Sequence, residues 1–448
     1  MIRLTWVQPE DLIGHELRQA AEDGREGGPD GARVAAVAAR WHAAGGHDAP
    51  PRAGASEPGA QALRPLAEEL LDELAAIPSP LDEPDDLPAI IAACPSWPRP
   101  GGAAAGPDRV LGAWQGRAAG CVLGKPVEKI PRTGIREIAE ATGNWPIRGW
   151  FTAEGLPPEV AARWPWNRRS AVNSLAENID GIPEDDDLNY PLLALSVLER
   201  HGRGFTTDDV ARLWLDELPA GRTFTAERVA YRNLLDGVEP PRTATRRNPF
   251  REWIGALIRA DVYGWVNPGD PGTAAEYAWR DARLTHTANG LYGAMFVAAM
   301  CASSMVAGST EEVVEAGLSV VPPGSRLHRA VRRAVADAAR EDDFERVADL
   351  LHQRHGGLHW VHTVNNAALV AAALVHGRGD FTATVAGAVA GGWDTDSAGA
   401  TAGAIAGALR GGVPGQWALR DSLASSLTGF DGIGLKELAR RTQELMPA

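Results

Sequence analysis

Two short acidic clusters lie more than two hundred residues apart in this chain. The first is Glu184 to Asp187, and the second is Asp394-Thr395-Asp396-Ser397, which follows Gly391 and Gly392. Carboxylates at this density repel one another, so a folded protein needs a positive charge to offset them. Mg²⁺ and Mn²⁺ take oxygen ligands of this kind. The pattern predicts a site for one or two divalent cations if the clusters meet in the fold.

Each cluster alone has a simpler interpretation. Acidic residues at a helix start stabilise the helix dipole, and Ser397 could be an ordinary N-cap before a helix expected from Ala398. In an extended turn, however, the Asp394 and Asp396 side chains can point to the same side and converge on one cation. The first cluster precedes a helix expected from Leu188, and four acids in a row exceed what capping requires. Two such clusters, each before a core helix, favour a metal site.

The elements that must hold these residues in place are expected to be helices. From Arg109 onward, apolar residues recur at helical spacing and runs of alternating β-branched residues are scarce. The sequence predicts an all-α fold, a multi-helix bundle. The predicted helices cover residues 109–123, 188–200, 208–218, 224–235, 250–263, 273–282, 288–307, 310–318, 325–340, 343–354, 365–376, 381–390, 398–409 and 435–445.

Two of the predicted helices carry glycine at every fourth position. These glycines are Gly112, Gly116, Gly120 and Gly124 in one helix and Gly399, Gly403 and Gly407 in the other. Each costs about 0.5–1 kcal/mol relative to alanine inside a helix, so a compensating reason is needed. Compositional bias toward glycine and alanine is one explanation. The strict spacing favours another, a flat ridge that lets two helix backbones approach closely.

Residues 1–108 differ from the rest and are predicted to be an accessory region before a catalytic domain at residues 109–448. Helices are expected at residues 11–22, 33–42 and 60–77. Residues 78–107 are dense in proline and glycine, which is typical of a linker or an extended strap. No residue pattern in this region indicates chemistry.

Composition excludes several classes of function. The formal net charge of -14 argues against binding to nucleic acid or to an anionic membrane surface. No apolar run reaches transmembrane length, and the start of the chain lacks a signal-peptide pattern. The three cysteines are far apart and suggest no disulfide framework. We therefore expect a soluble cytoplasmic protein, with a composition typical of a GC-rich bacterial genome.

Three motifs carry a resemblance to a known family. The first runs from Gly120 to Glu128, the second is Asp185-Asp186-Asp187-Leu188, and the third runs from Gly392 to Ser397. In type and order they resemble motifs of the ADP-ribosylglycohydrolases, the class that includes the dinitrogenase-reductase-activating glycohydrolase. The resemblance extends from about Arg109 to the C-terminus. It implies an all-α hydrolase that cleaves an N- or O-glycosidic bond to ADP-ribose or a related riboside.

The resemblance also implies a binuclear Mg²⁺ or Mn²⁺ site and roles for individual residues. The implied metal ligands are Asp185, Asp186, Asp187, Asp394, Asp396 and Ser397, and Glu128 would be the general base or would position the attacking water. The substrate would be a small-molecule or protein-linked riboside. Three positions depart from the family: Asp185 replaces a threonine, Leu188 closes the second motif, and Cys121 stands where an acidic residue is frequent. These departures indicate a divergent branch.

Further polar residues near the starts of expected helices are candidates for substrate binding. A histidine at such a place is more often a hydrogen-bonded structural residue, although it can also act as a ligand or an acid. Trp393, inside the second acidic loop, could stack on a base or a sugar. The candidates are His286, Asn289, Gly290, Tyr292, His362, Asn365, Gly392 and Trp393.

Three other functions compete with the hydrolase interpretation. A phosphatase of the haloacid dehalogenase type needs a buried strand before its Asp-x-Asp motif, but residues 384–390 are alanine-rich and helical in pattern. A terpene synthase needs a further acidic residue after Asp185–Asp187 and a second Mg²⁺ motif, and both are missing. A non-catalytic member of the same fold, which binds ADP-ribose or a nucleotide or serves structurally, is the remaining alternative. The presence of Glu128 together with all the aspartates favours an enzyme.

Overall fold

The computed structural model describes residues 4–50, 61–106 and 108–447, and within these ranges the regular secondary structure is helical. Short 3-10 helices connect the α-helices, and β-structure in the described residues is limited to isolated bridges such as Trp253 with His362. The prediction of an all-α fold is confirmed. No helix in the described ranges has both the length and the apolar character that crossing a bilayer requires.

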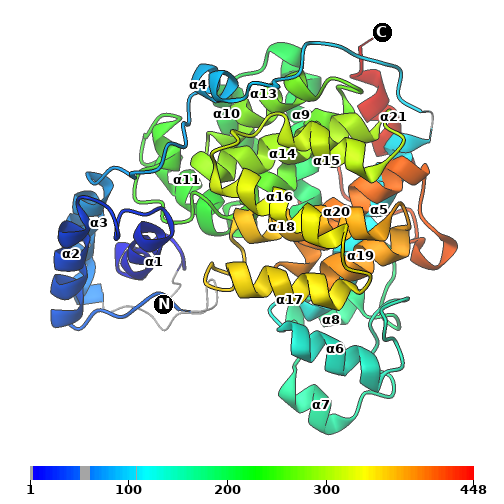
Figure 1. Ribbon diagram of the computed structural model, residues 1–448, viewed down its shortest axis with the longest axis horizontal. Helices are drawn as coiled ribbons and strands as arrows, with labels where there is room; N and C mark the ends of the chain where they lie inside the picture. Colours follow the sequence, from blue (N-terminus) through cyan, green and yellow to red (C-terminus); the bar gives the residue numbers. More distant parts are fainter. Residues whose placement is uncertain (1–3, 51–60, 107, 448) are drawn as a thin grey trace.

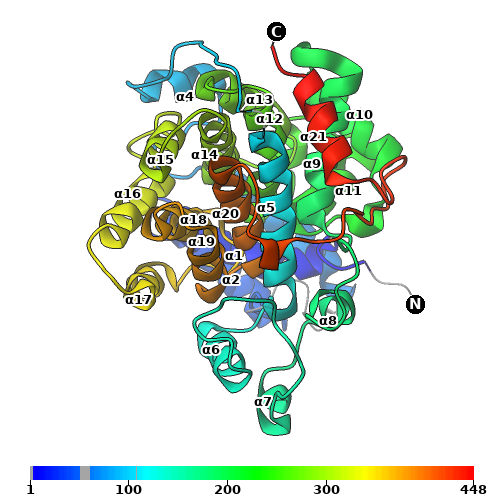
Figure 2. The same cartoon turned by 90° about the vertical axis from the view of Figure 1, so that its right-hand side faces the viewer.

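A pair of glycine-rich helices forms the centre of the molecule. Helix α5 (Arg109–Gly124) and helix α20 (Thr395–Arg410) lie side by side (Figure 2). A Cβ atom built on Gly116 would lie 1.9 Å from the Gly403 carbonyl oxygen, and one on Gly120 would lie 2.0 Å from the Gly399 oxygen. The two backbones are therefore in direct contact with no side chain between them. The glycine spacing predicted this close packing.

The other helices surround this pair in layers. Helix α14 (Ala288–Ser304) carries buried residues at nearly every position, as expected for a helix inside a large bundle. The helices in contact with α5 or α20 include α9 (Asp186–His201), α14 (Ala288–Ser304), α18 (Thr363–Gly377), α19 (Phe381–Ala390) and α21 (Leu435–Glu444). Further out lie α10 (Thr207–Glu217), α11 (Thr225–Leu235), α13 (Pro271–Ala282), α15 (Thr310–Leu318), α16 (Arg326–Ala338) and α17 (Phe344–His355).

One predicted helix is divided into two shorter elements in the structure. The helix expected over residues 250–263 is a 3-10 helix, Ile254–Arg259, followed by the short α12, Asp261–Trp265. Arg259 is buried there and forms ion pairs with Glu227 and Asp281, a tertiary constraint that local propensity does not contain.

Three short helices between the first and second motifs were not predicted. They are α6 (Arg132–Ala141), α7 (Pro158–Arg163) and α8 (Arg168–Ser174), which lie together below the bundle (Figure 1). A small apolar cluster around Ile135, Ile138 and Phe151 packs them against the end of the bundle. Helices this short carry too few periodic residues to stand out in a sequence.

The N-terminal region contains the three predicted helices, α1 (Pro9–Glu22), α2 (Gly31–Ala43) and α3 (Arg64–Ala75), at the left in Figure 1. Residue 60, the predicted start of the third helix, lies outside the described residues. The predicted linker contains a fourth helix, α4 (Leu87–Ala93), whose N-cap Asp86 accepts a hydrogen bond from the Ala89 amide. Ile90 is buried, which anchors this helix to the body. The domain boundary at residue 108 stays a prediction.

Buried ion pairs attach the N-terminal region to the bundle. Arg326, at the start of α16, lies 2.6 Å from Glu83 of the strap and 2.7 Å from Glu252. Arg251 in turn lies 2.8 Å from Glu16 and 3.2 Å from Asp23. These side chains are mostly shielded from water, so the loss of one member of a pair leaves the other as an uncompensated buried charge. The region is thus bound to the bundle through charged contacts at several points.

We expect Arg326→Ala to loosen this attachment. The change leaves Glu83 and Glu252 without their shared cation, and breaking a buried pair from one side costs about 3 kcal/mol or more. Limited proteolysis should then cut the segment between α4 and α5 faster than in the wild type. The matched control is Arg329→Ala on the same helix, where the side chain is exposed. Equal cleavage rates in both variants would contradict this account of the attachment.

The same junction buries histidines in their neutral form. Burial, with Arg18 nearby, lowers the pKa of His15 to about 3 and that of His359 to about 2. The unfolded chain binds a proton at each near pH 6.5, so folding stability should fall as the pH drops below about 6.5. His15→Phe removes one titrating group among the Phe250 and Trp253 rings.

The unfolding free energy of His15→Phe, measured by urea denaturation, should depend less steeply on pH than that of the wild type. Between roughly pH 6 and pH 4, the two slopes should differ by up to about 1.4 kcal/mol per pH unit. An unchanged slope would contradict the burial of a neutral His15.

Candidate metal and catalytic site

The two acidic clusters meet at the end of the α5–α20 pair. Asp185 is the N-cap of α9, and its side chain accepts a hydrogen bond of 3.0 Å from the Asp187 amide. The Ser397 hydroxyl donates to Asp187 Oδ2 at 3.0 Å, which joins the second cluster to the first. The extended turn predicted for Asp394–Ser397 is wrong, because α20 begins at Thr395 with Asp394 as its N-cap. The carboxylates converge at two helix N-termini, whose dipoles favour negative charge.

Glu128 brings a carboxylate from the first motif into the same place. It follows α5 and the short 3-10 helix Lys125–Val127, and its carboxylate oxygen lies within 4.8 Å of oxygens of Asp394 and Asp396. Cys121, Asp185 and Asp187 form a second group with ligand atoms within the same distance of one another. Three carboxylates are suitable ligands for a hard divalent cation such as Mg²⁺ or Mn²⁺. The donor set at Glu128, Asp394 and Asp396 therefore fits the ion that the motifs predicted.

The pKa values of the clustered aspartates also favour a bound cation. Burial, followed by the neighbouring Glu128 and Asp185 carboxylates, raises the pKa of Asp396 to about 7. Burial and the Asp396 charge likewise raise the pKa of Asp394 well above its ordinary value. The pKa of Asp186 is raised by burial and by Asp185 and Asp187 on either side. The protein holds more negative charge here than its own basic residues offset, and a divalent cation would supply the difference.

Two buried basic side chains contact the first cluster. Lys125 forms an ion pair with Asp185, and this pairing lowers the pKa of Asp185 although burial alone would raise it. Arg117 donates to the Asp187 carbonyl at 2.7 Å and lies 3.3 Å from its carboxylate. Sequence analysis did not identify either residue. Arg117, Cys121 and Lys125 recur every fourth residue along α5, which places them on one face of the helix and could have revealed them.

Three further polar residues hold the site residues in place. Asn366 accepts a hydrogen bond of 3.2 Å from the Asp394 amide. The Asn167 amide group donates to Glu128, and Lys129 lies 2.9 Å from the other oxygen of that carboxylate. Asn167 is the N-cap residue of α8, so the segment of α6 to α8, which was not predicted, contributes to the site.

Four of the predicted substrate residues lie near the second cluster. Gly392 and Trp393 precede Asp394 directly, and the Trp393 ring is stacked on His352 with ring centroids 4.2 Å apart. Gly392 adopts a φ of +74°, which favours glycine. His362 and Asn365 lie at the start of α18, one turn or less from Asn366. The His362 side chain faces the N-terminal region, with Nε2 3.9 Å from a Glu22 carboxylate oxygen. Trp393 is buried, so one of its faces is covered by the protein itself.

The other four predicted substrate residues lie at the start of α14 and contact the N-terminal region or the bundle. Asn289 donates to Glu83 at 2.8 Å, and the Tyr292 hydroxyl donates to the Pro84 carbonyl at 2.7 Å. His286 is buried beside Thr285, and a Cβ on Gly290 would lie 2.4 Å from the Arg251 carbonyl oxygen. The structure gives all four a packing contact, and their role in substrate binding stays a prediction.

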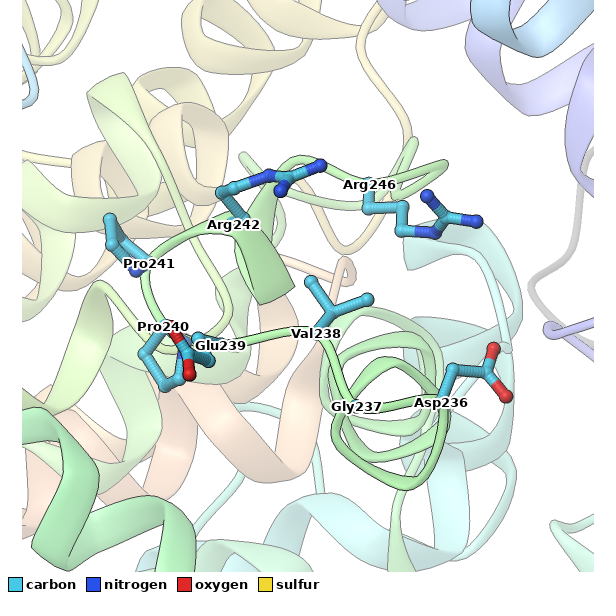
Figure 3. Close-up of a pocket in the computed structure, with 8 residues that line it drawn as sticks. All are labelled: Asp236, Gly237, Val238, Glu239, Pro240, Pro241, Arg242 and Arg246. Carbon is cyan, nitrogen blue, oxygen red and sulfur yellow. The ribbon is translucent and has the colours of Figure 1, made fainter.

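A surface hollow elsewhere has no connection to the clusters. It has a volume of about 400 Å³ and is lined by residues 236–242 and Arg246 (Figure 3). Its lining includes no residue of the acidic clusters, and two arginines and two acids border it. The acidic clusters remain the group of described residues best suited to chemistry.

The sequence matches the model of one protein family. The model of the family described as ADP-ribosylglycohydrolase matches residues 103–447. No curated protein matches the sequence. A solved structure named "ADP-ribosylglycohydrolase-related protein complex" is similar over 75% of this chain and 96% of its own chain, with 24% sequence identity and a TM-score of 0.47.

Proposed function

Because the chain belongs to the ADP-ribosylglycohydrolase family and its function is of the glycohydrolase type, we propose that it is a metal-dependent hydrolase of a ribosyl bond. Its substrate is an N- or O-glycoside of ADP-ribose or of a related riboside, either a small molecule or a modified protein. One observation carries the proposal. Glu128 places its carboxylate within 4.8 Å of both Asp394 and Asp396, so a base and two metal ligands share one site.

The metal would be held by residues of the second and third motifs. We assign Asp186, Asp187, Asp394, Asp396 and Ser397 as ligands of Mg²⁺ or Mn²⁺, with Asp185 in the place of a family threonine. The two groups of ligand atoms correspond to two cation positions. When bound, such an ion makes a nearby water a better nucleophile at neutral pH and gathers the ribose hydroxyls.

The residues of the chain then carry out the proton transfer. Glu128 accepts a proton from the attacking water, whose oxygen forms a bond to the anomeric carbon. The bond from that carbon to the leaving nitrogen or oxygen breaks, and the leaving group takes up a proton. Asn167 and Lys129 orient the Glu128 carboxylate, and Asn366 fixes the backbone at Asp394. Gly392, Trp393, His362 and Asn365 are the candidates closest to the bound sugar.

The direct test measures release of ADP-ribose or ribose from a panel of ADP-ribosylated and ribosylated compounds. We expect turnover with Mg²⁺ or Mn²⁺, loss of turnover with EDTA, and a loss of about 10²–10⁴-fold in Glu128→Gln, the usual contribution of a general base. Glu311→Gln is the matched control, because Glu311 is exposed and distant in sequence from all three motifs. Tight nucleotide binding with no turnover on any riboside would instead establish the non-catalytic alternative.

A further inference from the structure

The two groups of ligand atoms in the site differ in the chemistry they offer. Glu128, Asp394 and Asp396 supply carboxylate oxygens only, whereas the other group consists of Asp185, Asp187 and the Cys121 thiol. A thiol is a soft ligand and suits Mg²⁺ or Mn²⁺ poorly. The Cys121 thiol is also fully buried, and burial raises its pKa well above the ordinary value. The second group therefore offers fewer effective ligands for a hard ion than the first.

Both carboxylates of the second group already have cationic partners from the chain. The Lys125 ammonium pairs with Asp185 and also donates to the Glu184 carbonyl at 3.3 Å. Asp187 has one oxygen 3.3 Å from Arg117 and the other 3.0 Å from the Ser397 hydroxyl. Lys125 and Arg117 are both buried, which holds them in place and limits their screening by water. A divalent ion in the second group would have to compete with these partners.

The first group lacks such internal partners. Lys129 pairs with Glu128, but its side chain is 41% exposed and can move aside into water. Within the part of the chain that the structure describes, no ion pair connects Asp394 or Asp396 to a lysine or arginine. The charge of these two aspartates is therefore available to a bound ion.

The choice of lysine at residue 125 is itself unusual in this chain. Lys125, Lys129 and Lys436 are its three lysines, among 44 lysines and arginines. An ammonium is a compact point charge, whereas the guanidinium is a broad planar group. A chain this rich in arginine nevertheless has the compact cation at residue 125, which follows α5 directly and pairs with Asp185. The ammonium, like a small metal ion, fits a position defined by converging oxygens.

We propose that the Lys125 ammonium is a resident cation of the acidic site, so that the protein binds one divalent ion tightly at Glu128, Asp394 and Asp396. A second ion enters beside Asp185 only when Lys125 is displaced. Where the family has a neutral threonine, this chain has Asp185 paired with Lys125. The Lys125 ammonium then replaces one of two tightly bound metal ions. The inference rests on the metal centre of the proposed function and deepens it.

The test measures metal binding without any activity assay. Wild-type protein is dialysed against increasing MnCl₂, bound manganese is counted by mass spectrometry, and the bound ions are examined by electron paramagnetic resonance. We expect one tightly bound Mn²⁺ per chain with the resolved hyperfine pattern of an isolated ion. A second ion should bind at least about 10-fold more weakly, because it must share its position with an ammonium.

Removing Lys125 should open the second position. Lys125→Met removes the competing ammonium and keeps the Asp185 and Asp187 carboxylates, so it should bind two Mn²⁺ ions per chain with an exchange-coupled resonance spectrum. Lys129→Met is the matched control, because it removes a lysine from the first group and should leave the count at one. If Lys125→Met does not fold, the wild-type titration alone still decides the question.

The outcomes separate this inference from the proposed function. Two equally tight Mn²⁺ ions in the wild type would overturn the role of Lys125 and leave the metal-dependent hydrolase intact. A single bound ion in Lys125→Met would do the same. Failure of the wild type to bind any Mn²⁺ would overturn both the inference and the metal centre.

Discussion

Asp394→Asn is expected to abolish hydrolysis and to remove the rise in melting temperature that Mg²⁺ or Mn²⁺ gives the wild-type protein. Asp394 occupies the N-cap position of α20, and its nearly fully buried side chain has an oxygen within 4.8 Å of Glu128 and Asp396 carboxylate oxygens. Replacing a charged ligand by an amide weakens ion binding and removes several kcal/mol of transition-state stabilisation, or roughly 10³-fold or more in rate. Asp186→Asn should behave in the same way.

The measurements are riboside turnover and thermal unfolding with and without the metal. Asp216→Asn provides the matched control, since it makes the same chemical change at an exposed position of α10. It should keep both the activity and the metal-dependent rise in melting temperature. Without metal, Asp394→Asn should be at least as stable as the wild type, because it removes one of several repelling charges. Unchanged activity in either cluster variant would end the assignment of these aspartates as ligands.

Gly116→Ala should destabilise the protein strongly, although alanine is the better helix former. At an ordinary exposed position in a helix, this change stabilises by about 0.5–1 kcal/mol. Here the added Cβ would lie 1.9 Å from the Gly403 carbonyl oxygen, so α5 and α20 must separate. Overpacking of this kind costs about 3 kcal/mol. The unfolding free energy, measured by urea denaturation, should fall by that amount.

Metal affinity should fall with it, because the same two helices bring Glu128 to Asp394 and Asp396. Gly221→Ala is the control, since a Cβ at that position meets no atom within 4 Å. It should change stability by less than about 0.5 kcal/mol, as surface substitutions usually do. If Gly116→Ala proved as stable as the wild type, direct backbone contact would not be what holds the pair together.

Local patterns in the chain were enough to predict the helical architecture and to indicate the chemical type of the site. Helical spacing of apolar residues predicted most helices from α9 to α21 to within a few residues, because amphipathic periodicity is a local property of the chain. The four-residue glycine spacing of α5 and α20 predicted a close backbone contact, since only a missing Cβ allows it. Dense carboxylates indicated a cation, because charge repulsion follows from composition alone.

Which of these groups come into contact could not be predicted before the fold was known. The hydrogen bond from Ser397 to Asp187 and the ion pair from Lys125 to Asp185 join residues far apart in sequence. Their distances depend on how the helices pack, which no local pattern specifies. The same holds for the predicted substrate residues Asn289 and Tyr292, whose side chains donate hydrogen bonds to Glu83 and Pro84 of the N-terminal strap. Polar side chains at helix ends look alike in sequence, and packing determines whether each faces a ligand or another part of the chain.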